Sequence, residues 1–460
     1  MGEDIRLKSL KQLTIPELIK LQAEKFSSKP ALISDMEILS FSDLDNLSSN
    51  IAYHLINLGV SHGDRVAIWA PNMNEWVLAA IAIHKAGGVL VPINTRMKGK
   101  EAAYILNNAQ AKILFSVKNF LGTDYFKMLE KEDLPDLQCQ ISLDESDAND
   151  SIQSFSRLRE QSSKVELPQV NETDMADIIF TSGTTGKPKG VISTHIQNIK
   201  VFDYWSTFIG LNENDQYLIV NPFFHTFGYK AGWLASVMRG ATAYPCPVFD
   251  ADKIIEMIDK QKISMLPGPP TLYQSILTSK LIGTMDISSL RLGVTGAASI
   301  PVQLIKDMKE KLGFETVITA YGLTESTGVV TMCTPKDNYE TIATTSGCAI
   351  ADVEVKCINQ DGQEVPAGEP GEILVRGYNI TQGYFNNPDA TQEAIDNKGW
   401  LHTGDIGILD DNGYIKITDR SKDMFIVGGF NAYPAEIENI LCDHPAISQA
   451  AVIGIEDERM

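Results

Sequence analysis

The strongest chemical signal in the chain is a run of glycine, serine and threonine within residues 177–195, DIIFTSGTTGKPKGVISTH. An apolar, β-rich run leads into it, and two lysines follow closely. Glycines let the backbone approach an anion and aim successive amides at it, hydroxyls add donors, and lysines add positive charge. The glycine spacing and the proline after the first lysine exclude a Walker A loop. We therefore predict a phosphate-binding loop made by Thr181, Ser182, Gly183, Thr184, Thr185, Gly186, Lys187 and Lys189.

Three further motifs follow this loop, namely YGLTES at 321–326, WLHTGDIG at 400–407 and DRSKDMFIVGGFNAYPAEIE at 419–438. Together with TSGTTGKPKG they resemble, in order and spacing, the signatures of the adenylate-forming superfamily. That superfamily includes acyl- and aryl-CoA synthetases, luciferases and the adenylation domains of peptide synthetases. The resemblance covers essentially the whole chain. It implies a ligase that uses ATP and Mg²⁺ to convert a carboxylic acid to acyl-AMP and then transfers the acyl group to CoA.

The resemblance also assigns nucleotide-binding roles to individual residues. In YGLTES, Tyr321 suits stacking on adenine, Thr324 suits an α-phosphate oxygen, and Glu325 suits Mg²⁺ beside that phosphate. The hydroxyl of Thr184 is expected near the metal and the phosphates. In the separate segment GVTGAAS, the small residues Gly296, Ala297 and Ala298 would let a flat base lie against the backbone, and Gly322 of YGLTES is also expected at the nucleotide.

The last two motifs are expected to contact the sugar and the thiol substrate. Asp405 is placed to accept hydrogen bonds from the ribose hydroxyls, as acidic residues commonly do, and Arg420 is expected at the sugar or a phosphate. Lys422 corresponds to the family's interdomain hinge. Gly428 and Gly429 suit a surface along which the pantetheine arm of CoA passes, because side chains would block it.

The segment NPFFHTFGYKAG at 221–232 resembles the edge of the family's acid pocket. His225 is expected near the carboxylate, where it completes the catalytic set with Thr184 and Glu325. Phe227 and Tyr229 are expected to line the acyl group. Lys230 is unusual for a fatty-acyl tunnel, because a buried lysine needs a polar partner, which a keto group on the acid could supply. This segment, with LPGPPTLYQ, VTGAAS and TAYGLTES, looks most like CoA ligases for a propanoate side chain on degraded steroid rings; a medium-chain fatty acid is the alternative.

Helical and strand patterns alternate along the chain, which predicts crossover units and parallel sheets covered by helices. We expect an AMP-binding α/β domain at 1–419 with two helix-flanked sheets and a β-rich subdomain at 353–419. A hinge at 420–422 would lead to a small, partial α+β domain at 423–460. Polar sequence from 130 to 171 suggests a loose surface excursion.

Bulk properties narrow the partners and the compartment. The 460 residues carry a formal charge of −20, which makes a nucleic-acid backbone an improbable partner. The six cysteines are scattered with no CxxC pair, which favours a reducing compartment over a disulfide framework or a zinc site. Residues 76–93 are the most apolar stretch, but their charges, glycines and proline favour a buried helix and strand over a membrane span. We expect a cytoplasmic protein without integral membrane association; the oligomeric state stays open, with a homodimer as one alternative.

Two other classes of function remain open. The family's C-terminal adenylation lysine, in a PxxxxGK-like segment, has no counterpart here, so we expect nucleotide binding but slow adenylation. The chain could instead load a carrier protein with the acyl group, or be a non-catalytic module that binds adenylates. An α/β-hydrolase is disfavoured because no GxSxG motif occurs.

Overall fold

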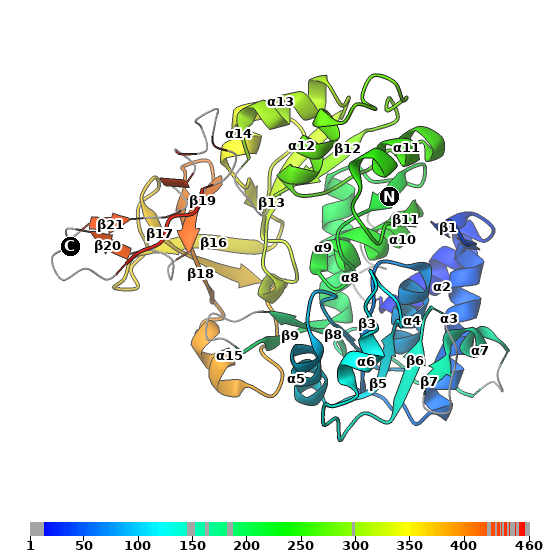
Figure 1. The fold of residues 1–460 in the computed structure, drawn as a ribbon. Helices are drawn as coiled ribbons and strands as arrows, with labels where there is room; N and C mark the ends of the chain where they lie inside the picture. Colours follow the sequence, from blue (N-terminus) through cyan, green and yellow to red (C-terminus); the bar gives the residue numbers. More distant parts are fainter. Residues whose placement is uncertain are drawn as a thin grey trace, which may run out of the picture. The chain divides into compact units, whose positions relative to one another are not determined.

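The computed structural model describes residues 13–144, 152–161, 165–181, 187–296, 300–420, 425–427, 430–432, 434, 437–438, 441, 447 and 450–455 (Figure 1). The chain forms two compact units. The first unit comprises Met1–Pro267, Thr278–Leu292 and Thr381–Pro388. The second unit comprises Gly268–Leu277, Gly293–Ile380 and Asp389–Met460. Each unit is described by itself below.

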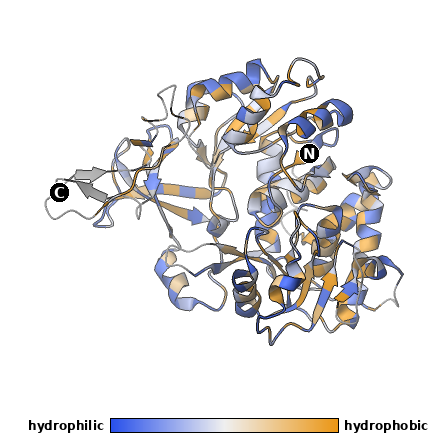
Figure 2. Ribbon diagram, in the orientation of Figure 1, coloured by the Kyte–Doolittle hydropathy of each residue, from blue (hydrophilic) through white to orange (hydrophobic). Residues whose placement is uncertain are grey.

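A seven-stranded sheet in the order β7-β6-β5-β3-β4-β8-β9 dominates the first unit. Its strands pair in parallel except for the antiparallel pair β8–β9. Figure 2 shows that these strands carry mostly hydrophobic residues. The strands are β3 (Arg65–Trp69), β4 (Val89–Pro92), β5 (Ala111–Ser116), β6 (Cys139–Ser142), β7 (Ile152–Ser154), β8 (Met175–Thr181) and β9 (Lys189–Thr194).

Helices α4 (Asn74–Lys85) and α5 (Gly99–Ala109) accompany this sheet, with α4 against β3 and β4 and α5 against β5, and α3 (Phe41–Asn57) packs against α4. All but one residue of α4 are buried, and all four residues of β4 are buried, which confirms the buried helix and strand predicted for residues 76–93. None of the helices in the described ranges is long and apolar enough to cross a bilayer.

A second, four-stranded sheet of the first unit has the order β10-β11-β1-β2. Helix α2 is fixed at its start by a capping box, in which Thr14 and Glu17 each accept a bond from the other's backbone N–H. The elements of this part are α2 (Ile15–Phe26), β1 (Pro30–Ile33), β2 (Ile38–Ser40), α8 (His195–Phe208), β10 (Gln216–Ile219), α9 (Thr226–Gly228), η1 (Tyr229–Leu234), α10 (Ala235–Arg239), β11 (Thr242–Pro245) and α11 (Ala251–Gln261).

The second unit contains two more four-stranded sheets. One has the order β12-β13-β14-β15, formed by Leu292–Thr295, Thr316–Tyr321, Thr331–Met332 and Cys348–Ala349. The other is antiparallel, in the order β16-β17-β18-β19, formed by Val353–Ile358, Pro370–Gly377, Leu401–Leu409 and Ile415–Arg420. Other elements are α12 (Pro270–Thr278), α13 (Val302–Glu310), η2 (Thr324–Ser326), α14 (Tyr339–Thr344), α15 (Pro388–Ala394), β20 (Phe425–Val427) and β21 (Phe430–Ala432).

The predicted α/β class with helix-flanked sheets and a β-rich part is confirmed. One expectation was wrong: the polar stretch 130–171 is not a loose excursion, because β6 and β7 within it extend the seven-stranded sheet. The few apolar residues of this stretch anchor it to the core, since Ile141, Ile152, Phe155 and Leu158 are all buried. Strands of three or four residues give too short a pattern to stand out from polar surroundings.

Candidate active site

The predicted phosphate loop connects the two strands of the β8–β9 hairpin. Thr181 ends β8 and lies opposite Lys189, the first residue of β9. Residues 182–186, which include the predicted Ser182, Gly183, Thr184, Thr185 and Gly186, lie outside the described residues. Lys187 is exposed, and the Nζ atom of Lys189 lies 5.1 Å from the ring centroid of Tyr384. The hairpin therefore brings two cations and a hydroxyl to the ends of the loop.

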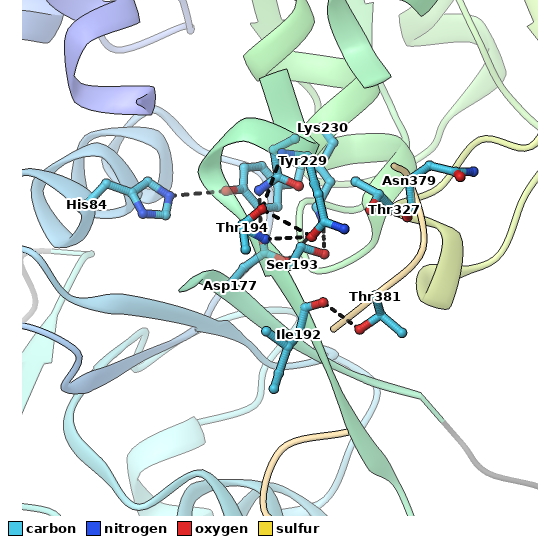
Figure 3. Close-up of polar contacts among 12 residues, drawn as sticks. His84, Asp177, Ile192, Ser193, Thr194, Tyr229, Lys230, Thr327, Asn379 and Thr381 are labelled. Atoms are coloured by element: carbon cyan, nitrogen blue, oxygen red, sulfur yellow. Dashed lines mark hydrogen bonds and ion pairs between the residues drawn. The ribbon is translucent and has the colours of Figure 1, made fainter. Parts of the chain in front are cut away.

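Residues 381–385, which belong to the same unit, bond to the edge of β9 that does not pair with β8. Thr381 Oγ1 donates to the Ile192 carbonyl at 2.6 Å, as Figure 3 shows, and the Ile192 amide donates to the Gly383 carbonyl at 3.2 Å. The Phe385 amide donates to the Gly190 carbonyl at 2.7 Å. These bonds satisfy the outer polar groups of β9 and fix the strand that leaves the phosphate loop.

Within the acid-pocket segment, His225 is the N-cap of α9. The Phe227 amide donates to His225 Nδ1 at 3.2 Å. The helix then changes to a π-helical turn at Tyr229–Leu234, in which Gly232 leaves the helical region with ψ −105°. Single π turns are rare and occur frequently at functional sites. Local backbone geometry thus distinguishes the segment that the sequence assigns to the acid.

His225 and Phe227 remain candidates for contact with an acid. The His225 side chain is exposed at the surface and Phe227 is half-buried. Desolvation by the surrounding protein, and then the charge of Lys230, lower the pKa of His225 below its ordinary 6.5. The imidazole is therefore neutral at pH 7, and its Nε2 atom can carry the proton while Nδ1 accepts the Phe227 amide.

Tyr229 and Lys230 follow, and both side chains are fully buried. The Tyr229 hydroxyl lies 3.1 Å from His84 Nε2 (Figure 3), and its ring stacks on Trp233 with centroids 5.2 Å apart. Lys230 Nζ lies 3.0 Å from Asp177 Oδ1 and donates to Ser193 Oγ at 2.9 Å. The protein itself therefore supplies polar partners for Lys230, for which a keto group on the acid was one expected source.

The second unit holds Tyr321, Thr324 and Glu325, predicted for adenine, phosphate and metal, in one turn. Tyr321 ends β13, and its carbonyl accepts the Val330 amide at 2.7 Å, which closes the turn that contains Thr324 and Glu325. A Cβ atom on Gly322 would lie 2.2 Å from the Gly328 carbonyl oxygen, so only glycine fits this approach. Thr324 and Glu325 are half-buried. Gly296 follows β12, whereas the predicted Ala297 and Ala298 lie outside the described residues.

Asp405 is presented by a β-bulge in β18. The pairing of β17 with β18 shifts register between Glu372 and Leu374, and Gly404 opposite this shift has φ +70°. The Gly404 amide donates to Glu372 Oε1 at 3.2 Å, and Thr403 Oγ1 donates to the Ile373 carbonyl at 2.7 Å. A bulge of this kind re-aims the next side chain, which here is Asp405.

The bulge directs Asp405 to Tyr321, whose hydroxyl donates to Asp405 Oδ2 at 2.6 Å. Two residues predicted to contact one nucleoside are thus in direct contact. Arg420 pairs with Asp405 across β18 and β19, but its side chain lies outside the described residues. The predicted hinge residue Lys422 and the CoA-site residues Gly428 and Gly429 also lie outside them.

Sequence reasoning missed the buried partners of the acid segment, namely His84, Asp177, Ser193 and Asn198. The signal was present in one respect: Asp177 stands in the apolar run DIIF, where a carboxylate needs a partner as much as Lys230 does. The two sites are far apart in the sequence, so no local pattern joins them.

The fold and these two sets of residues define an adenylate-forming enzyme. The chain belongs to the AMP-binding enzyme family, whose model matches residues 19–385. It is 44% identical over 459 residues to the 3-(7a-methyl-1,5-dioxo-octahydro-1H-inden-4-yl)propanoyl:CoA ligase of Rhodococcus jostii, covering 97% of this chain and 87% of the relative. It is 42% identical to the Mycobacterium tuberculosis ligase of the same name, with the same coverage.

Solved structures agree with this assignment. The anthranilate CoA ligase AuaEII in complex with anthranoyl-AMP superposes with a TM-score of 0.89 at 28% identity, covering 97% of this chain and 85% of that one. The o-succinylbenzoate CoA synthetase of Bacillus subtilis, in complex with ATP and a magnesium ion, has a TM-score of 0.82 at 29% identity and coverage of 96% and 87%. The recognition of the adenylate-forming family from four motifs is therefore confirmed.

Proposed function

We propose that this chain is an AMP-forming acid–CoA ligase whose acid is a propanoate carried on a fused diketone ring system of steroid origin. The observation that carries the proposal is the identity, over nearly the whole chain, with two ligases for such a propanoyl group. Within the acid-pocket segment at 221–232, the exposed His225 offers an imidazole for the carboxylate of such an acid. Because Lys230 is paired within the protein, ring keto groups would be recognised by other residues.

The chemistry proceeds in two displacements. An oxygen of the carboxylate attacks the α-phosphorus of ATP, and the bond to the pyrophosphate oxygen breaks. The sulfur of CoA then attacks the acyl carbon, and AMP leaves with the electron pair of the acyl–oxygen bond. In the first step we assign phosphate binding to the β8–β9 loop with Lys187 and Lys189, and alignment of the acid to His225. Positioning and charge neutralisation account for most of such catalysis.

The remaining roles concern the nucleoside, the metal and CoA. Tyr321 and Asp405 are proposed to hold adenine and ribose, consistent with their direct contact. Glu325 and Thr184 offer oxygen ligands of the kind Mg²⁺ prefers, and the half-buried position of Glu325 in its turn suits such a ligand. When bound, the ion would neutralise charge on the phosphates. Arg420, Lys422, Gly428 and Gly429 keep their predicted roles at the sugar, the hinge and the CoA arm.

An acid panel tests the proposal. Purified protein is assayed for acid-dependent AMP and CoA thioester with the diketo-indane propanoate, octanoate, palmitate and benzoate. We expect kcat/KM for the first acid to exceed the others at least tenfold. A preference for octanoate would show that the substrate is a medium-chain fatty acid instead. Thioester formed with free CoA alone would exclude an obligate carrier protein.

A binding measurement separates a slow enzyme from a non-catalytic module. Non-hydrolysable acyl-sulfamoyl adenosines of the same four acids are compared by thermal shift, because a ligand that binds only the folded state stabilises it by mass action. Stabilisation without AMP formation would identify a module that binds adenylates. No shift and no turnover with any acid would contradict the proposal.

The expected cytoplasmic location and the homodimer stay predictions. Cell fractionation tests the first, and light scattering of the purified protein tests the second.

A further inference from the structure

A buried polar cluster lies in the first unit between the acid-pocket segment and the β8–β9 hairpin (Figure 3). We call it the Lys230 cluster; it consists of Lys230, Asp177, Ser193 and Asn198. Lys230, Asp177 and Asn198 expose no surface, and Ser193 is 1% exposed. Lys230 Nζ lies 3.0 Å from Asp177 Oδ1 and 2.9 Å from Ser193 Oγ, while Asn198 Nδ2 donates to Asp177 Oδ2 at 2.6 Å.

The cluster joins both strands of the hairpin to the acid-pocket segment. Asp177 on β8 and Ser193 on β9 are direct register partners, so one ammonium group contacts both strands at the same level. Asn198 adds helix α8, which follows β9 and packs against the π turn η1. The ion pair is therefore the point at which hairpin, helix and π turn meet.

One side of the Lys230 cluster leads along β8 to the proposed phosphate loop, and the other side leads through η1 and α9 to the proposed acid site. Asp177 precedes Thr181, the last described residue before the phosphate loop, by four positions, or roughly 13 Å of extended strand. Lys230 lies one turn of helix beyond Phe227 and is joined to His225 through α9. A shift of the π turn along the hairpin would thus move the acid-binding side chains relative to the phosphate loop.

Stability alone does not explain a lysine at this position. Desolvating a lysine and an aspartate costs so much that a well-packed apolar pair is often at least as stable. What the cluster adds is direction: the hydrogen bonds from Lys230 to Ser193 and from Asn198 to Asp177 require particular distances and orientations between the segments they connect. An apolar pair in the same space would hold the segments together without fixing their register.

We propose that Lys230 is a positioning residue that sets the acid-pocket segment against the phosphate-loop hairpin, so that the carboxylate meets the α-phosphate in line. This inference rests on the proposed function. Lys230 acts through the backbone of its own turn and does not touch the substrate. A misplacement of about 1 Å in such an alignment costs on the order of a hundredfold in rate.

The test uses the double variant Lys230→Met/Asp177→Asn. It removes both charges together, so no unpaired charge is left buried, and the new amide still offers Asn198 an acceptor. The control is Lys85→Met/Asp45→Asn, which breaks a matched group in the same unit: Lys85 Nζ lies 2.6 Å from Asp45 Oδ1 and 2.9 Å from Ser49 Oγ. Lys85 is 5% exposed and joins α4 to α3.

Two readouts decide the matter. We expect kcat for acid-dependent AMP formation to fall about a hundredfold in the Lys230 variant, while KM for ATP changes less than about threefold and the control keeps its rate. Hydrogen exchange should rise in peptides 177–194 and 225–234 together, and in neither for the control. A rate within about threefold of wild type, or a rise in only one segment, would overturn the proposal.

Ser193→Ala serves if the double variant does not fold. It removes the contact of the ammonium group with β9 and leaves the ion pair, so we expect exchange to rise in 189–194 and kcat to fall several-fold. Unchanged exchange and rate would count against the positioning role. Should wild type make no AMP with any acid, the proposed function fails, whereas the exchange readout still shows whether Lys230 holds the two segments together.

Discussion

The hydroxyl of Tyr321 donates a hydrogen bond to Asp405 Oδ2 at 2.6 Å. Tyr321 ends β13 and Asp405 follows the bulge in β18, so two sheets of the second unit are joined through their predicted nucleoside residues. Asp405 is 6% exposed, and the bond fixes the direction in which its second oxygen points. The site residue is therefore already oriented by protein contacts.

The first prediction removes this hydroxyl. Tyr321→Phe keeps an aromatic face for adenine but removes one of the contacts that orient Asp405. We expect KM for ATP to rise about tenfold, because a hydrogen bond to a charged group contributes about 1.5–3 kcal/mol. The control is Tyr414→Phe, which removes the bond from Tyr414 Oη to Asp337 Oδ1 at 2.8 Å in the same unit. Equal effects of the two changes on KM would show that Asp405 needs no orientation by Tyr321.

A second prediction concerns the bulge. Gly404→Ala places a side chain at φ +70°, which costs about 1–3 kcal/mol and turns Asp405 away from Tyr321. Urea unfolding should show this loss, and discrimination between ATP and 2′-deoxy-ATP should weaken. Gly413→Ala, at φ +84° in the turn between β18 and β19, carries similar strain outside the candidate site. It should lower stability while leaving the discrimination intact; a parallel loss in both variants would argue against the bulge.

The third prediction separates the two roles of His225. His225→Asn retains a side-chain acceptor for the Phe227 amide, because asparagine is a good N-cap, but removes the imidazole. We expect the melting temperature to change little and KM for the acid to rise about tenfold, the size of one lost hydrogen bond. An acid KM equal to that of wild type would remove His225 from the acid site.

The fourth prediction is a loss of stability in mild acid. Burial lowers the pKa of His195 to about 4, a shift that Asp174 opposes and His62 reinforces, and burial also lowers that of His84 well below 6.5. The unfolded chain takes up protons as pH falls below 6.5 while the folded chain does not, so the free energy of unfolding decreases. For His195 the loss continues to about pH 4 and then levels off.

Chemical denaturation at pH 7 and pH 5 measures this effect. His195 alone should contribute about 2 kcal/mol of the loss over that range, since one pKa unit corresponds to about 1.4 kcal/mol. His195→Gln should show a smaller loss between the two pH values than wild type. The same dependence in both proteins would assign the acid sensitivity to other groups.

The parts of the fold that could be predicted from the sequence are those with a clear local hydrophobic pattern. The apolar stretch at 76–93 gave the correct helix and strand, because it is long and strongly patterned. The pairing of Lys230 with Asp177 could not be predicted, since it depends on how two distant segments pack. The bulge at Gly404 was equally hidden, because HTGD reads as an ordinary turn until the register of β17 and β18 is known.

The contact between residues 381–385 and β9 has a consequence for biosynthesis. The chain completes β9 at Thr194, but the segment that bonds to its outer edge leaves the ribosome almost two hundred residues later. Until then, β9 is an unpaired edge next to a glycine-rich loop, and such edges pair readily with other chains. The nascent protein thus carries the outer edge of β9 uncovered while residues 195–380 are synthesised, which makes this edge a natural target for chaperones on the ribosome.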